Sequence, residues 1–140
     1  MSAGRNLIAY GAVAVVVAAV VGGVVLIGSP SSQRILRFDE QRVSNLRSLS
    51  SAIEIFAARH AALPQDLDAL LADPTVYAQS TRDPETGSPY AYRIINAQSY
   101  ELCAEFGAAS ADATYVPDGF RHPEGHHCFT FTIPGKPSPG

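Results

Sequence analysis

The string RHPEGHHC, residues 121–128, is the densest group of side chains that could bind a metal. Zinc accepts imidazole, carboxylate and thiolate ligands, and the string supplies all three through His122, Glu124, His126, His127 and Cys128. One interpretation is therefore a metal-binding module. We favour a second interpretation, a polar loop that leads into a strand, because adjacent histidines in a strand point to opposite faces.

The overlapping stretch DATYVPDGFRHPEG offers oxygen ligands through Asp112, Asp118 and Glu124. Calcium binds such groups, but this loop lacks the dense alternation of oxygen ligands found in an EF-hand. We therefore predict no bound metal and no other cofactor.

Catalytic patterns are missing from the sequence. It contains serine and histidine, but no nucleophile elbow, no phosphate-binding loop and no pair of carboxylates that marks a site. Asp66 and Asp68 are better explained as solvated residues of a short helix. We predict a protein that is not an enzyme and has no small-molecule substrate.

The only two cysteines, Cys103 and Cys128, both fall in predicted strands. This arrangement favours a structural disulfide formed in an oxidising compartment. The bond would close a loop of about 26 residues and stabilise the fold by about 3 kcal/mol in the chain-entropy model. Cys128 would then not be available to zinc.

The segment LIAYGAVAVVVAAVVGGVVLI, Leu7 to Ile27, has no charged residue. At 1.5 Å per residue its length suffices for a hydrocarbon core of about 30 Å. We predict a transmembrane helix over residues 7–28 after a short flank, residues 1–6. A cleaved signal peptide is the alternative, but its apolar core is usually only about 7–15 residues long.

Small residues recur every fourth position along this helix, as Ala14, Ala18 and Gly22, with Ala19 and Gly23 repeating the step. Such a strip lets a second helix approach closely within lipid. We therefore expect the membrane helix to pack against another membrane subunit or a copy of itself.

Two sequence features disagree about orientation. Arg5 precedes the apolar segment and Arg34, Arg37, Arg42 and Arg47 follow it, so the positive-inside tendency alone would keep the C-terminal domain in the cytoplasm. The cysteine pair favours an oxidising compartment. We give the cysteines more weight and predict a bacterial inner-membrane protein with a cytoplasmic N-terminus and a periplasmic or extracellular domain.

The charge balance excludes one class of partner. From residue 62 onward, four basic residues accompany ten acidic ones. Nucleic-acid binding requires clustered lysine and arginine, so we expect no nucleic-acid partner.

Downstream of the membrane segment, the pattern predicts an extracytoplasmic domain over residues 29–133 and a flexible tail over 134–140. A long amphipathic helix is expected over 33–61, with serine caps after the break at Pro30. Its apolar stripe comprises Leu36, Val43, Leu46, Leu49 or Ser50, Ile53, Phe56 and His60, opposite Arg37, Glu40, Arg47 and Glu54. A short helix over 64–72 should cover the end of the stripe with Leu67, Leu70 and Leu71.

Three strands are expected near residues 89–95, 98–106 and 126–133 because apolar and polar residues alternate there. The short NAQS segment favours an antiparallel hairpin between the first two. The aromatic face should pack on the helix, and both cysteines should lie on the other face. The fold class is therefore α+β, with a long amphipathic helix packed on a small antiparallel sheet.

This order of parts resembles the type IV pilin fold, and within it the major pseudopilins of type II secretion systems. The resemblance covers roughly residues 34–106. It rests on the phrases HAALPQDLDALL and DPETGSPYAYRI, and on the order and spacing of Leu63, Pro64, Leu67, Leu70, Asp83, Pro84, Gly87, Pro89, Tyr90 and Tyr92.

One feature of that family is not matched. Its members carry a basic leader, a glycine at the prepilin-peptidase site, a following phenylalanine and a glutamate five residues on, whereas MSAGRNLIAYGAV offers only isolated glycines. We therefore expect an accessory or scaffolding subunit of a larger membrane complex. The alternative is a pseudopilin of a secretion or pilus machine, which cleavage at Gly4 or Gly11 would favour.

Overall fold

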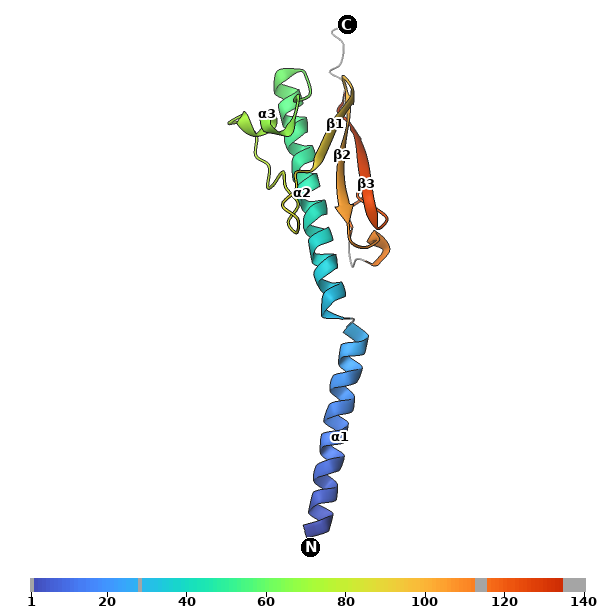
Figure 1. Cartoon of the computed structure of the whole chain (residues 1–140). Coiled ribbons are helices and arrows are strands. Elements are labelled where there is room, and N and C mark those ends of the chain that lie inside the picture. The colour runs from blue at the N-terminus through green and yellow to red at the C-terminus, as the bar shows by residue number, and fades with distance from the viewer. Residues whose placement is uncertain (1, 28, 113–115, 135–140) are drawn as a thin grey trace. The chain divides into compact units, whose positions relative to one another are not determined.

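The computed structural model describes residues 2–27, 29–112 and 116–134 (Figure 1). The chain divides into two units, residues 1–34 and residues 35–140. We call the second unit the head. The architecture is α+β as predicted, with apolar helical sequence at the N-terminal end and a three-stranded antiparallel sheet in the head.

Helix α1, Ser2–Ile27, contains the apolar segment. It begins before the predicted boundary because the polar residues ahead of Leu7 also adopt helical geometry. The described side chains of α1 are exposed, apart from half-buried Gly23. Within the described residues, one helical stretch is long and apolar enough to cross a membrane, and its apolar window belongs to α1.

Helix α2, Pro30–His60, is the long amphipathic helix. Proline suits its first position because the missing N–H would have no helical partner there. The hydroxyl of Ser29 accepts a hydrogen bond from the amide of Ser32 at 3.3 Å, which confirms the expected serine cap. The predicted polar face is exposed: Arg37, Glu40, Arg47 and Glu54.

The buried face of α2 differs from the predicted stripe at its edges. Val43, Leu46, Leu49 and Ile53 are buried as expected. Leu36 and Phe56 are only half-buried, and His60 is exposed. Two charged residues, Asp39 and Arg42, are buried instead, which the stripe did not predict.

Helix α3, Leu67–Ala72, is shorter than predicted. Asp66 is exposed as expected, and it is also the N-cap of α3, because its carboxylate accepts a hydrogen bond from the backbone amide of Ala69 at 2.7 Å. Leu67 and Leu70 are buried in the core as expected. Leu71 was wrongly assigned to the core; it is half exposed, since two adjacent helical positions cannot face the same neighbour equally.

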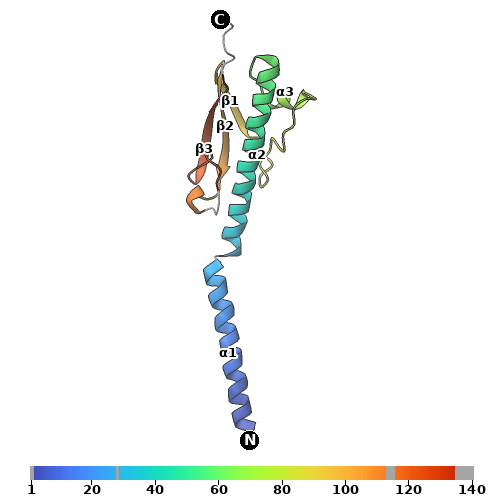
Figure 2. The same cartoon turned by 180° about the vertical axis from the view of Figure 1, so that it is seen from behind.

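The sheet has the order β1-β2-β3, with Ala91–Asn96, Ser99–Phe106 and Gly125–Thr132 as its strands. Both pairings are antiparallel, and β2 is central. Figures 1 and 2 view the head from opposite sides, and both show the sheet lying along α2. The predicted hairpin is confirmed, with Asn96 opposite Ser99 across its turn.

Three tyrosines join the sheet layer to the helical layer. The hydroxyl of Tyr90 accepts a hydrogen bond from the amide of Asn45 at 3.0 Å, and that of Tyr92 donates to the carbonyl of Pro64 at 2.9 Å. Tyr100, which is fully buried, lies with its hydroxyl 3.4 Å from the carbonyl of Ser50. Each ring therefore fills the core while its polar end is satisfied.

The alternation of faces holds along β2 and β3 but not to the end of β1. Tyr100, Leu102, Ala104 and Phe106 of β2 face the core. Ile94 is two residues after Tyr92 in β1, yet 42% of its surface is exposed. β1 is an edge strand of the sheet. Most of the predicted tail, residues 135–140, lies outside the described residues.

Candidate functional site

The small-residue strip lies on an open surface of α1. Ala14, Ala18, Ala19 and Gly22 are exposed. A Cβ atom added to Gly22 or Gly23 would meet no atom within 4 Å. No contact among the described residues therefore requires a glycine at these two positions, and they leave room for another helix.

The two cysteines form a disulfide across the middle of the sheet. Cys103 of β2 lies directly opposite Cys128 of β3, and the two sulfurs are 2.08 Å apart. Both lie on the sheet face opposite the aromatic core, as the alternation predicts. The expected pairing is confirmed.

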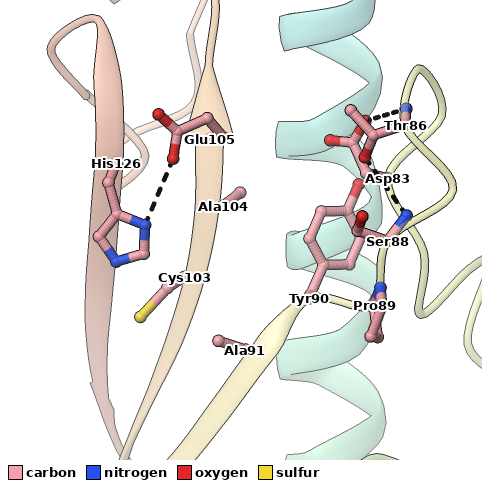
Figure 3. A pocket seen from close by; sticks show the side chains of 10 residues that line it. All are labelled: Asp83, Thr86, Ser88, Pro89, Tyr90, Ala91, Cys103, Ala104, Glu105 and His126. Atoms are coloured by element: carbon pink, nitrogen blue, oxygen red, sulfur yellow. Dashed lines mark hydrogen bonds and ion pairs between the residues drawn. The ribbon is translucent and has the colours of Figure 1, made fainter.

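Two ionisable side chains flank this disulfide. His126 lies two residues before Cys128, on the same face of β3, and pairs with Glu105 of β2. Its Nε2 is 3.5 Å from Sγ of Cys128, and its Nδ1 is 3.5 Å from a carboxylate oxygen of Glu105. Figure 3 shows Glu105 and His126 turned toward each other above Cys103. All three residues line an open pocket of about 170 Å³.

The predicted metal candidates do not gather around one point. Among the residues whose side chains the structure describes, the one group of three potential ligands is Cys103, His126 and Cys128. His122 is buried and stacked on Phe106 at 3.6 Å between ring centroids, and its backbone amide donates to Ser110. Burial lowers the pKa of His122, which suits a neutral side chain packed in the core.

The other candidates also have different surroundings. The ring of His127 meets Phe129 edge-on at 4.8 Å. Asp118 and Glu124 are exposed. The side chain of Asp112 lies outside the described residues. The loop residues considered as zinc or calcium ligands are therefore not brought together in the part of the chain that the structure describes.

The most polar place inside the head is a buried cluster around Arg42, which sequence reasoning missed. Its guanidinium donates to Asp39 at 2.8 Å, to both carboxylate oxygens of Asp83, and to Glu85 at 2.7 Å. Arg42, Asp39 and Asp83 are each less than a tenth exposed. The cluster ties α2 to the loop that leads into β1.

Asp39 extends the cluster to the end of β2. Its two carboxylate oxygens accept hydrogen bonds from the backbone amides of Gly107 and Ala108 at 3.0 and 2.9 Å. A Cβ atom on Gly107 would lie 2.6 Å from the side chain of Ile35, so a larger residue here would require the exposed Ile35 side chain to move. One cluster thus fastens three segments that are distant in sequence.

The charges in the cluster stabilise one another. Burial alone would raise the pKa of Asp83, but hydrogen bonds from Arg42 and from the amides of Thr86 and Glu85 outweigh it and lower the pKa to about 2. Burial alone would lower the pKa of Arg42, and its three carboxylate partners raise it instead. Both groups remain charged at neutral pH.

This shift predicts an acid-sensitive contribution to stability. The pKa of Asp83 is lower in the folded chain than in the unfolded chain, so its contribution is complete above the unfolded value of about 3.9 and is lost as the pH falls toward 2. Between pH 5 and pH 2, we expect the free energy of unfolding of the wild-type protein to fall by about 2 kcal/mol more than that of the Asp83→Asn variant. Unfolding monitored by the near-ultraviolet circular dichroism of tyrosine measures this difference. Equal losses in both proteins would contradict it.

Comparison with known proteins identifies no relatives: no protein-family model, no curated protein and no solved structure matches this chain. The described structure therefore identifies only a general class of protein. It is an α+β protein with a disulfide-bonded head and, among the described residues, one helix long and apolar enough to cross a membrane.

Proposed function

We propose that this protein is a non-enzymatic, single-pass subunit of a membrane complex. In this proposal α1 crosses the bacterial inner membrane, and the head stands in the periplasm or outside the cell. The observation that carries the proposal is α1 itself, whose described side chains are exposed and almost entirely apolar. Such a surface is unstable in water and is stable in lipid or against another apolar helix.

The small-residue strip supports a role in assembly rather than anchoring alone. Lipid provides little hydrophobic drive between helices, so their association depends on close packing and on hydrogen bonds. Ala14, Ala18 and Gly22 have short side chains or none, so the backbone of a neighbouring helix could approach α1 closely on that side. We infer that the partner is another membrane subunit or a second copy of this chain.

The head suits a structural role. Its long helix, small antiparallel sheet and order of parts support the proposed likeness to pilins and pseudopilins. The disulfide and the Arg42 cluster each join distant segments of the head. A head stabilised in this way suits a scaffolding subunit. Assignment of the C-terminal side to an oxidising compartment rests on the disulfide.

Topology provides the test of this proposal. We expect the full chain to remain in the membrane pellet after an alkaline wash. A reporter enzyme that becomes active only where its disulfides form should be active when fused after residue 140 and inactive when fused before residue 1. Release by the alkaline wash, or activity only of the N-terminal fusion, would contradict the proposal.

A further inference from the structure

Three potential metal ligands lie together on the outer face of the sheet. The sulfur atoms of Cys103 and Cys128 and a ring nitrogen of His126 all lie within 4.8 Å of one another. The strand register explains this grouping. Cys103 is directly opposite Cys128, and His126 is two residues earlier on the same face of β3.

The orientation of the His126 ring is a second, independent observation. Nε2 faces the sulfur of Cys128, and Nδ1 faces the carboxylate of Glu105, each at 3.5 Å. In metal sites, a histidine that binds the metal through one nitrogen typically donates its other N–H to a carboxylate, which fixes the ring. Nδ1 of His126 lies 3.5 Å from a carboxylate oxygen of Glu105, so a small rotation of either side chain would give that arrangement (Figure 3).

We propose that reduction of the Cys103–Cys128 disulfide creates a zinc site. The two thiolates and Nε2 of His126 are its protein ligands, water takes the fourth position, and Glu105 holds Nδ1 of His126. Nothing in this inference depends on α1 or on the partner of the membrane helix.

The chemistry balances in two steps. A dithiol reductant gives two electrons and two protons to the disulfide: the S–S bond breaks, two cysteine thiols form, and the reductant becomes a disulfide. Zn²⁺ then binds both sulfurs and releases their two protons to water, since thiolate is the form that binds metal.

The change in geometry is small. Two thiolates bound tetrahedrally to one zinc at about 2.3 Å lie about 3.8 Å apart. Cys103 and Cys128 are directly opposite each other in the strand register, on Cα atoms 4.0 Å apart. Rotation of the two reduced side chains can place their sulfurs at the spacing that zinc requires while β2 and β3 stay paired.

Access to the site comes from the open pocket. Its lining includes Cys103, Glu105 and His126, and both Glu105 and His126 are exposed. The pocket therefore leads from solvent to Cys103, and Cys128 opposite it is half-buried. In either redox state the two strands would be fastened, by a covalent bond or by the metal.

Cobalt provides a spectroscopic test, because Co²⁺ accepts the same ligands and absorbs when thiolates bind it. Full-length protein in mild detergent would be reduced with a phosphine, which takes oxygen from water to become the phosphine oxide. We expect the reduced chain to bind one Co²⁺ with a thiolate-to-cobalt charge-transfer band that Zn²⁺ abolishes. Oxidised chain should bind none.

Variants separate this site from adventitious binding. His126→Ala should weaken cobalt binding by at least about 10-fold, and Glu105→Gln by about 10- to 100-fold. His127→Ala is the matched control, since it removes an adjacent imidazole on the opposite face and should leave binding unchanged.

Four results would overturn the inference. They are an absence of thiolate-to-cobalt absorption in reduced protein, equal binding by oxidised protein, equal losses in the His126→Ala and His127→Ala variants, and loss of the strand signal in circular dichroism on reduction without recovery on adding zinc.

Discussion

Replacing Arg42 with methionine should lower the free energy of unfolding of the head by about 3–5 kcal/mol. The substitution removes the guanidinium that contacts Asp39, Asp83 and Glu85, and it leaves two of these carboxylates buried. The cost arises from the uncompensated buried charge more than from the lost attraction. Backbone amides would still donate to both buried carboxylates, which places the expected value toward the lower end.

Arg47→Met is the matched control for this prediction. Arg47 lies on the same helix and is exposed, so its substitution should change stability by no more than about 0.5 kcal/mol. Chemical denaturation followed by tyrosine circular dichroism measures both variants, since the chain has no tryptophan. Equal stability of the two variants would show that the buried cluster does not hold the head together.

Replacing Ile53 with aspartate should be more damaging still, by more than about 4 kcal/mol. Ile53 is fully buried in the core where α2 meets the sheet. A carboxylate there would lose its hydration among apolar neighbours, without an opposite charge to compensate it. We expect a head that is unfolded or close to unfolding at room temperature.

Ile55→Asp controls for the change of residue type and of net charge. Ile55 is two positions further along the same helix and 45% exposed, so aspartate there stays hydrated. Its effect should remain below about 1 kcal/mol. Similar melting temperatures for the two variants would mean that the face of α2 against the sheet is not the one described.

The fold was largely predictable from sequence because each element carried a periodic signal. The apolar run, the three- and four-residue steps of α2 and the alternation along β2 and β3 each dictate one buried face. The disulfide followed from two cysteines that fall on the same predicted sheet face. Errors arose at the edges: Ile94 and Leu71 fit the local pattern, yet about half of each side chain is exposed.

The polar interior could not be predicted in the same way. Asp39 and Arg42 look like ordinary surface residues of an amphipathic helix, and their partners Asp83 and Glu85 are about forty residues away. The one local signal was the spacing of Asp39 and Arg42, three residues apart, which permits an ion pair on any helix. Similarly, the proximity of His126 to Cys128 and Cys103 depends on the register between β2 and β3. In the sequence, the histidines instead suggested a metal site in the loop before β3.

The most direct test of the proposed role measures the mass of the detergent-extracted particle that contains this chain. Ala18→Leu with Gly22→Leu keeps α1 apolar, and a Cβ atom added at Gly22 would meet no atom of the described residues within 4 Å. The double substitution should therefore insert normally, yet it fills the strip and blocks a partner helix. The control is Val16→Leu with Val24→Leu, which leaves the strip intact.

We predict that wild type and the Val16, Val24 control migrate as the same large particle, while the Ala18, Gly22 variant migrates as a single chain in its detergent micelle. A variant that inserts normally and migrates with the wild type would contradict the account, because α1 would then be an anchor that makes no contact through its small residues.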